Sequence, residues 1–388
     1  MKKILLLGGS SQQIVAIAEA KKMGYFTIVC DYLKENPGQY VADKFYLVST
    51  TDKDKILQIA INEKIDGIIA YASDPAAPTS AFVAEKMGLP SNSFNSVDIL
   101  CNKDRFRRFL AKNGFSVPAV YDDIESVNSF PVVIKPVDSS GSKGVVVVNN
   151  QSELKKAYNF ALDFSRCGRV IIEDFVVKNH EYLIGGDIFI IDGEIKLWGL
   201  LNCHRDASSN PLVPVGKSYP LALSEKQVEI VKKTLRDLVF KLGIKFGPMN
   251  VELIIDEKDD CYLIDAGPRA GGNMIPDFLG MIFEINIVQM CIKCAMGEKV
   301  DVNPIKKEQY CATHNLHSNI GGIYKTIIFD DQISQFIVKK FLYKKEGDIV
   351  EPFYNAANAL GIIFMKFNNK ENMELLKNIN NHYKVEMS

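Results

Sequence analysis

The first ninety residues alternate between apolar runs and amphipathic stretches, and this alternation constrains the fold more than any other feature. An apolar run ends at Gly8 and Gly9, a helical pattern follows to Gly24, and a second apolar run, FTIVCDY, comes next. The same order continues through a helical pattern over 52–64 and the run IDGIIAYASD. Because strands joined through a helix pair in parallel, we expect a small parallel sheet with helices on both faces.

An acid at the end of the second apolar run raises the question of a bound dinucleotide. Asp31 stands where a dinucleotide-binding fold holds a ribose hydroxyl. However, the turn before the first helix reads GGSSQQ and lacks the GxGxxG spacing that brings a pyrophosphate to a helix N-terminus. We therefore favour a plain Rossmann-like module over a dinucleotide-binding one.

Composition limits the remaining function classes. The chain has 388 residues, more than one hydrophobic core usually organises, so we expect two or three packed units. Its net charge of -1 gives no general attraction to nucleic acid or to an anionic membrane, and its first apolar run is too short for a signal peptide or a membrane span. The eight cysteines are scattered through apolar segments, which is typical of reduced thiols in a cytoplasm. Cys291 and Cys294 form a lone CxxC, interpreted as two core thiols.

The pattern changes in the middle of the chain. Asn102 has the position and chemistry of a helix N-cap, and from Phe130 onward short apolar strands alternate with tight turns. A helical pattern over about 152–164 interrupts them, and strands with helices gathered elsewhere indicate α+β architecture. The Pro-, Ser- and Gly-rich stretch 205–219 predicts a long mobile loop. After about residue 310 come further strands and a helical pattern in NKENMELLKNINNHY, which predict a small C-terminal subdomain.

A lysine followed by a loop of small polar residues is the first candidate for chemistry. Lys135 ends the apolar run VVIKPV, and the loop DSSGSKG spans 138–144. Such a loop offers backbone N–H groups that no side chain blocks, and the lysine adds a fixed positive charge, so the pair suits phosphate oxygens. The segment lacks GxxxxGK[ST] and no helix follows it, so it is not a P-loop. Taken alone, such a loop is more often only a turn.

Acids recur at the ends of later strands. Glu173 ends an apolar strand, and the extended DFVV and Glu181 follow, an order that suits an adenine beside main-chain groups and a ribose beyond it. Glu252 and Asp265 are expected on adjacent strands that end on the same side, where hard oxygen ligands and a triphosphate would hold Mg²⁺. Arg269 follows the second strand and could clamp a phosphoryl group. Ordinary surface acids are the alternative interpretation.

Four segments resemble, in order and spacing, the ATP-grasp superfamily of carboxylate-amine ligases. They are NKDRFRRFLAKNGFSVP, VIKPVDSSGSKGVVVV, IIEDFV with HEYLIGG, and NVELIID with YLIDAGPRAGGN. Each motif alone is weak, but four in order are specific, and the likeness covers nearly the whole chain. The resemblance implies an ATP-grasp fold that combines α/β and α+β parts. Its expected parts are an N-terminal Rossmann-like parallel-sheet domain over 1–95, an ATP-grasp domain over 96–309 with a small lid subdomain over about 118–180, and a C-terminal α+β subdomain over 310–388.

The resemblance also implies a role for each matching residue. ATP phosphates would be contacted by Lys103 and Lys135 and covered by Ser139, Ser140, Gly141, Ser142 and Gly144. Adenine would be held by Glu173, Asp174, Phe175 and Val176, and ribose by Glu181. Mg²⁺, with Mn²⁺ as an alternative, would be bound by Glu252 and Asp265, and the catalytic residues would be Arg269 and Lys135.

One motif departs from the family's pattern. The second metal strand usually reads Glu-x-Asn-Pro-Arg, whereas residues 265–269 read Asp-Ala-Gly-Pro-Arg. Aspartate is shorter, and Gly267 supplies no side-chain oxygen, so a second metal ion would lose a ligand unless water, Asn250 or Asn273 replaces it. A catalytically weak protein that only binds ATP is therefore kept as an alternative.

The activity that the resemblance implies is an ATP-dependent ligase. It would phosphorylate a small carboxylate to an acyl phosphate and join it to an amine or similar nucleophile, releasing ADP and phosphate. The segment HRDAS from His204 favours a rival, a bicarbonate-using enzyme of the carbamoyl-phosphate synthase or carboxylase branch. The C-terminal subdomain is more like the L-amino-acid ligase branch. We expect small-molecule partners, no nucleic acid or membrane, and a cytoplasmic location; a homodimer is a common state, but no sequence feature marks its interface.

Overall fold

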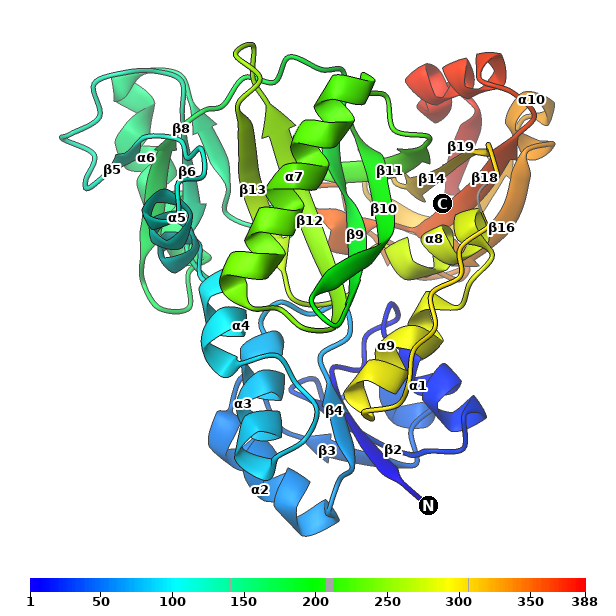
Figure 1. Cartoon of the computed structure of the whole chain (residues 1–388). Helices are drawn as coiled ribbons and strands as arrows, with labels where there is room; N and C mark the ends of the chain where they lie inside the picture. Colours follow the sequence, from blue (N-terminus) through cyan, green and yellow to red (C-terminus); the bar gives the residue numbers. More distant parts are fainter. Residues whose placement is uncertain (140, 207–211, 306) are drawn as a thin grey trace. The chain divides into compact units, whose positions relative to one another are not determined.

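The chain folds into two compact units. The computed structural model describes residues 1–139, 141–206, 212–305 and 307–388 (Figure 1). The first unit consists of Met1–His180, Gly186–Gly199 and Leu223–Pro304, and the second of Glu181–Gly185, Leu200–Ala222 and Ile305–Ser388. The chain passes from one to the other within two strands, β9 (Leu183–Ile191) and β10 (Glu194–Arg205). The domain boundaries expected near residues 95 and 309 stay predictions.

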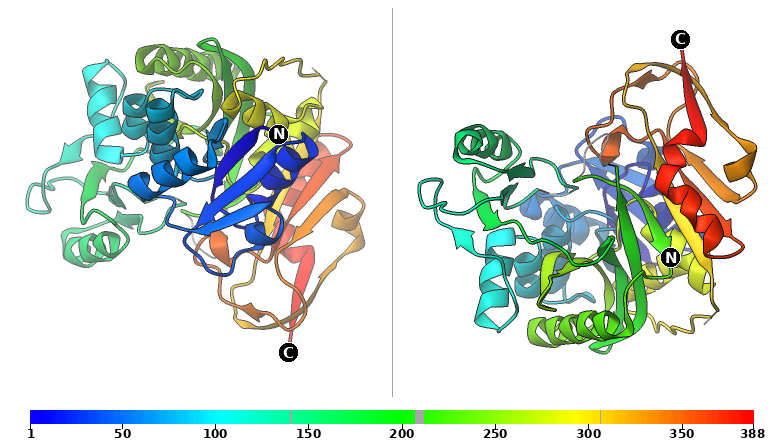
Figure 2. Two further views of the ribbon diagram at one scale, coloured as in Figure 1. Left: turned by 90° about the horizontal axis from the view of Figure 1, so that it is seen from below. Right: turned by 90° about the horizontal axis from the view of Figure 1, so that it is seen from above.

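The first unit begins with the predicted parallel sheet, and this prediction is confirmed. Its strands follow the order β3-β2-β1-β4, and every neighbouring pair is parallel (Figure 2, blue strands). The strands are β1 (Lys3–Leu7), β2 (Phe26–Asp31), β3 (Lys44–Leu47) and β4 (Gly67–Ile69), and the connecting helices are α1 (Ile14–Lys22) and α2 (Lys53–Glu63), with a 3₁₀ turn η1 (Pro37–Tyr40). Gly24, just past α1, has a φ of 86°, which favours glycine over other residues.

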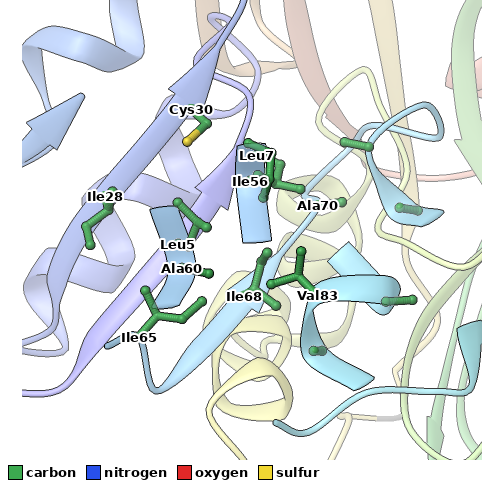
Figure 3. Packing of buried hydrophobic residues seen from close by; sticks show 14 of the residues in the cluster. Leu5, Leu7, Ile28, Cys30, Ile56, Ala60, Ile65, Ile68, Ala70 and Val83 are labelled. Carbon is green, nitrogen blue, oxygen red and sulfur yellow. The ribbon is translucent and has the colours of Figure 1, made fainter. Parts of the chain in front are cut away.

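Apolar side chains from this sheet and from three helices form one core (Figure 3). Leu5 and Ile28 come from adjacent strands, Ile56 from α2, and Val83 from α3 (Ala77–Met87), and all four are fully buried. Burying one such side chain stabilises a fold by about 1.5–3 kcal/mol. This core fixes the loops at the carboxyl ends of β1 and β4.

The turn after β1 uses Asp31 for its own structure. The Asp31 carboxylate accepts hydrogen bonds from the backbone N–H of Gly9 at 2.8 Å and of Leu33 at 2.9 Å. A Cβ at Gly9 would lie 2.1 Å from Asn36 Oδ1, so the turn requires a residue without a side chain. The Asp31 carboxylate therefore stabilises this turn, and the module without a dinucleotide stays a prediction.

A second sheet of the first unit carries the lysine and the polar loop. The strands lie in the order β5-β8-β6-β7 and pair antiparallel, and α6 covers them around the buried Leu154. The elements are β5 (Val120–Tyr121), β6 (Val132–Pro136), β7 (Val146–Val148), α6 (Gln151–Asp163) and β8 (Val170–Asp174). Helices α4 (Phe94–Leu100) and α5 (Lys103–Lys112) precede them, and Asn102 caps α5 as predicted by accepting from Arg105 N–H at 3.3 Å.

The remaining part of the first unit carries the acidic strands. Strands β12 (Gly247–Ile255) and β13 (Cys261–Gly267) pair antiparallel, and α7 (Glu225–Leu242) packs against β13 (Figure 1). Helices α8 (Ile275–Phe283) and α9 (Ile287–Ala295) follow. Within the described residues, no single helix has the length and apolar composition of a membrane span; α8 and α9 pass such a test only when taken together, and they are bent by 117°.

The second unit is mostly antiparallel strand. Neighbouring strands β11, β14, β18 and β16 pair antiparallel, and β15 pairs with β17 and β19. The elements are β11 (Pro214–Tyr219), β14 (Tyr310–Leu316), β15 (Gly322–Phe329), α10 (Asp331–Ser334), β16 (Ile337–Leu342), β17 (Ile349–Val350), η2 (Ala356–Asn358), β18 (Gly361–Phe367), η3 (Glu371–Asn381) and β19 (Tyr383–Met387).

Two local expectations in this unit were wrong. The stretch 205–219 was expected to be a loop, but Pro214–Tyr219 forms β11 between β10 and β14; residues 207–211 lie outside the described part. The helix expected near the C-terminus is a 3₁₀ stretch, η3, interrupted at Asn378, whose φ of -129° is not helical. Asparagine has a low helix propensity because its side chain competes for backbone groups, and Asn378 stands at the break.

Candidate functional site

Lys135 is held in place by a buried carboxylate that is shared with an arginine. Lys135 Nζ lies 2.7 Å from Glu173 Oε2, and Arg107 Nε lies 2.6 Å from Glu173 Oε1. The three side chains are only 9%, 1% and 4% exposed in the order Lys135, Glu173, Arg107. Arg107 also donates to the carbonyl oxygens of Leu263 at 2.7 Å and Ile264 at 2.9 Å. The arginine therefore ties the lysine-bearing sheet to the acidic strand β13.

Electrostatics keep this carboxylate ionised. Burial alone would raise the pKa of Glu173, but the attraction of Lys135 and then of Arg107 outweighs it and lowers the pKa to about 2. The side chain of Glu173 is thus committed to the two cations. The backbone of Glu173 lies in a ladder between β5 and β6, so its predicted contact with adenine stays a prediction.

The segment after Glu173 presents apolar side chains to solvent. The N–H of Asp174 donates to Ala119 O at 2.9 Å, and the N–H of Phe175 donates to Pro131 O at 3.1 Å. Phe175 is 38% exposed, and Val177, two residues on, is 67% exposed. An exposed apolar strip on a fixed backbone is what a planar base can pack against. The predicted adenine residues, Asp174 to Val176, lie on this strip.

The polar loop is joined to the helix cap through Lys103. The Lys103 ammonium donates to Ser139 O at 2.8 Å and lies 4.0 Å from Asp265 Oδ2. Gly141 and Gly144 have φ of 66° and 75°, and Ser142 has 59°, so the loop turns through left-handed backbone at three positions. Ser140, the remaining predicted loop residue, lies outside the described residues.

A narrow pocket of about 50 Å³ lies beside this loop. Its lining brings together the loop, the lysine of the helix cap, one predicted metal ligand and residues that sequence reasoning did not single out. The lining residues are Asp74, Pro75, Pro78, Leu100, Cys101, Lys103, Asp138, Ser139, Arg166, Asp265 and Ala266. The structure thus places Lys103, Ser139 and Asp265 around one small polar space.

The two predicted metal ligands face each other across neighbouring strands. Glu252 on β12 is the register partner of Asp265 on β13, and both are partly exposed, the Asp265 side chain by 44%. The expectation that the strands end on the same side was wrong, because β12 and β13 are antiparallel; the register, rather than the strand ends, brings the residues together. Within the described residues, no three His, Cys, Asp or Glu side chains gather as a metal site.

A pair of carboxylates still fits the metal that the motif implies. Mg²⁺ is usually held by one or two carboxylates together with phosphate oxygens and water, rather than by a complete protein cage. Both asparagines that were considered as an additional metal ligand make side-chain hydrogen bonds in the structure. Asn250 Nδ2 donates to Asp187 Oδ1 at 2.8 Å, and Asn273 Oδ1 accepts from Gln12 Nε2 at 3.3 Å.

Arg269 meets a partner that the sequence analysis missed. Its Nε lies 2.6 Å from Asp74 Oδ1 and its Nη2 lies 2.5 Å from Asp74 Oδ2, a two-pronged ion pair. Asp74 belongs to the turn after β4, far from Arg269 in sequence. No local pattern marks this aspartate, although its position beyond a strand of a parallel sheet could have drawn attention to it.

Glu181 lies in the second unit, where a larger pocket of about 560 Å³ is found. Glu181 and Tyr182 line it together with His204, Arg205 and Asp206 of the HRDAS segment. The Tyr182 and His204 rings lie with centroids 4.5 Å apart, and His204 Nε2 lies 2.8 Å from Ser218 Oγ. Burial lowers the pKa of His204 to about 4, with Lys217 adding to the effect, so this imidazole is neutral at pH 7.

Comparison with known sequences identifies one domain. Residues 128–277 match the family of the ATP-grasp domain. The formate-dependent phosphoribosylglycinamide formyltransferase of Bacillus subtilis is 26% identical over 286 residues, which are 69% of this chain and 71% of that protein. The carbamoyl phosphate synthase large chain of Thermotoga petrophila is 24% identical over 325 residues, 77% of this chain but only 29% of that one.

Comparison with solved structures extends the similarity over the full length. The L-amino acid ligase of Bacillus licheniformis superposes with a TM-score of 0.82 and covers 100% of this chain and 99% of its own, at 19% sequence identity. At this level of identity the comparison establishes a shared fold. It confirms the fold class expected from the four ordered motifs.

Proposed function

Starting from the match of residues 128–277 to the ATP-grasp domain family, we propose that the chain is an ATP-dependent carboxylate-amine ligase that binds Mg²⁺-ATP and phosphorylates a small carboxylate. An amine or similar nucleophile then attacks the acyl phosphate, which forms a C–N bond and releases ADP and phosphate. The single observation that carries the proposal is the position of Lys103. Its ammonium contacts the polar loop through Ser139 O and approaches the acidic pair through Asp265.

We propose the roles that the resemblance implies, and the chemistry of each residue is compatible with its role. Lys103 and Lys135 would hold ATP phosphates, and residues 139–144 would cover them with backbone N–H groups. Residues 173–176 would hold adenine through the apolar strip and through main-chain groups other than the N–H groups of Asp174 and Phe175, which already donate to carbonyl oxygens. Glu181 would accept from ribose hydroxyls. Glu252 and Asp265 would hold Mg²⁺, which when bound supplies positive charge against the phosphate oxygens.

Arg269 completes the proposed set of catalytic residues. Its guanidinium would hold the phosphoryl group during transfer, and Lys135 would stabilise the same developing charge. Phosphoryl transfer needs alignment and charge rather than a protein nucleophile. A site built from lysines, an arginine and two acids fits that requirement.

The proposal is tested by ADP release with panels of carboxylates and amines. We expect release that depends on both substrates and falls by at least about a hundredfold in Lys135→Ala and in Glu252→Ala. Lys112→Ala, which changes an exposed lysine at the end of α5, is the matched control and should leave turnover unchanged. Turnover that survives both site variants would refute the proposal.

A second candidate function is favoured by the HRD segment and by the carbamoyl phosphate synthase relatives. In this version bicarbonate is the carboxylate that receives the phosphoryl group. ATP hydrolysis that depends on bicarbonate alone would favour it. Tight ATP binding without hydrolysis under any substrate mixture would instead favour a binding protein.

We propose that the reaction takes place in a cytoplasm. Eight free cysteines, six of them buried, suit the reducing environment of a cytoplasm. We propose a homodimer because two-fold dimers are the commonest oligomers, and sedimentation of the purified chain tests this state. The domain division at residues 95 and 309 is tested by limited proteolysis.

A further inference from the structure

The ion pair between Asp74 and Arg269 joins a loop of the first sheet to the end of β13. Both carboxylate oxygens of Asp74 are engaged, and the two side chains are 22% and 13% exposed. A further N–H, on Arg269 Nη1, donates to Ala270 O at 3.1 Å. Because a guanidinium has five N–H groups, the described contacts leave one N–H on each terminal nitrogen for an anion.

Gly267 is the residue that makes room for this pair. A Cβ at position 267 would lie 2.3 Å from Asp74 Oδ1 and 3.3 Å from Arg269 Cζ. The backbone of Gly267 does not have positive φ, so glycine is required here by space and not by conformation. The departure from Glu-x-Asn-Pro-Arg thus has a physical reason, since the Asp74 carboxylate occupies the volume that a side chain at 267 would take.

Arg269 lines a separate pocket of about 90 Å³, and Asp74 is the member of the pair that reaches the narrow pocket beside the polar loop. Asp74 lines it together with Lys103, Ser139 and Asp265. Burial raises the pKa of Asp74, but Arg269 counteracts this and Lys103 adds to the counteraction, so the net shift is downward and the carboxylate is ionised. A charged, two-pronged partner fixes both the position and the plane of a guanidinium.

We infer that Asp74 is a positioning residue: it orients Arg269 for the transferred phosphoryl group, and the absence of a side chain at Gly267 is the condition for that orientation. The inference rests on the proposed function. It predicts that loss of Asp74 leaves the affinity for the nucleotide unchanged but weakens binding of the phosphoryl group during its transfer. A merely structural role would not separate these two quantities.

The test compares Mg²⁺-ADP binding with and without aluminium fluoride, a mimic of the transferring phosphoryl group, by calorimetry on the full chain. In the wild type, aluminium fluoride should tighten ADP binding. In Asp74→Asn the affinity for Mg²⁺-ADP alone should stay within about twofold, while the tightening should fall by at least about tenfold. Gly267→Ala should reduce the tightening by a similar factor. The double variant should show no smaller tightening than either single variant, because both changes act on the same ion pair.

The matched control is Asp98→Asn. Asp98 is also paired with an arginine, Arg105, and is 26% exposed, but it does not line the pocket, so its loss should leave both affinities unchanged. Full tightening in Asp74→Asn, or no tightening in the wild type, would overturn the inference while ADP binding still supports the proposed function. A wild type that does not bind Mg²⁺-ADP would refute the proposed function itself. Asp74→Asn is nearly isosteric and keeps the test open if Gly267→Ala fails to fold.

Discussion

The Lys135 ammonium and the Glu173 carboxylate form a contact of 2.7 Å across strands β6 and β8, and both side chains are almost completely buried. Arg107 lies on the other oxygen of the same carboxylate. A lysine fixed in this way loses little further freedom on binding a phosphate. The buried Glu173 carboxylate thus preorganises the Lys135 ammonium for a phosphate that Glu173 itself does not contact.

Removing that acid should loosen the lysine and weaken the fold. In Glu173→Gln, two buried cations lose their common counter-charge, and a loss of about 3–5 kcal/mol in the free energy of unfolding is expected. The KM for ATP should rise by about tenfold, because Lys135 is no longer held. Asp237→Asn, which breaks the surface pair with Lys233, is the control and should cost less than about 1 kcal/mol. Urea unfolding and steady-state kinetics measure both quantities, and equal effects of the two variants would argue against the account.

The same acid gives stability a defined pH dependence. The pKa of Glu173 is about 2 in the folded chain, against an ordinary value of 4.5. Because the folded value is the lower one, the ion pairs contribute fully above about pH 4.5, and the contribution is lost as pH falls toward about 2. The difference in unfolding free energy between wild type and Glu173→Gln should therefore shrink across this window. A difference that stays constant from pH 6 to about pH 2 is incompatible with this pKa shift.

Two glycines of the polar loop should respond differently to alanine. Both have positive φ, but a Cβ at Gly144 would lie 2.7 Å from Phe164 Cβ and 2.8 Å from Pro136 Cγ, whereas a Cβ at Gly141 meets nothing within 4 Å. Gly141→Ala should cost about 1 kcal/mol of backbone strain, and Gly144→Ala about 1–3 kcal/mol more from overpacking. ATP affinity should follow the same order in calorimetry. Affinities in both variants equal to that of the wild type would mean that the loop does not contact the nucleotide.

Thiol reactivity tests the burial of the cysteines. Cys167 is exposed, Cys101 is half-buried, and the other six are buried. Burial raises the pKa of Cys30 and of Cys294 to about 12, which keeps these thiols protonated and unreactive. A disulfide reagent should therefore label one cysteine rapidly in the native chain and all eight in denaturant. Rapid labelling that persists in Cys167→Ser would contradict this.

The sequence predicted what depends on local pattern. Alternating apolar runs gave the parallel sheet, and Asn102 gave the start of α5, because periodicity and capping are decided by neighbouring residues. The sequence did not reveal that Glu252 and Asp265 are register partners on antiparallel strands. The pattern locates where each strand ends, but it does not determine how the two strands pair. The prolines and glycines of 205–219 suggested turns and hence a loop. The strand β11 instead forms there because it pairs with its neighbours β10 and β14.

Long-range partners were the part that could not be predicted. Arg107 sits in an amphipathic helix where charge normally marks the solvated face, and only the folded chain places it against Glu173. Asp74 and Arg269 are far apart in the sequence, and only the folded chain brings them into contact. Gly267 leaves the space that this contact needs, but a glycine in the sequence does not name the residue that fills the space. Arg107 lies within the segment NKDRFRRFLAKNGFSVP, but that segment does not indicate its contact with Glu173, and Asp74 lies outside all four motifs.

Transfer of oxygen from the carboxylate to phosphate tests the central claim most directly. With a turnover-competent carboxylate labelled with ¹⁸O, attack on the γ-phosphorus leaves one carboxylate oxygen in the released phosphate. The account predicts phosphate that carries one ¹⁸O per turnover, observed by mass spectrometry, and no labelled phosphate with Lys135→Ala. Unlabelled phosphate released at the full rate of C–N bond formation would contradict an acyl phosphate and with it the proposed chemistry.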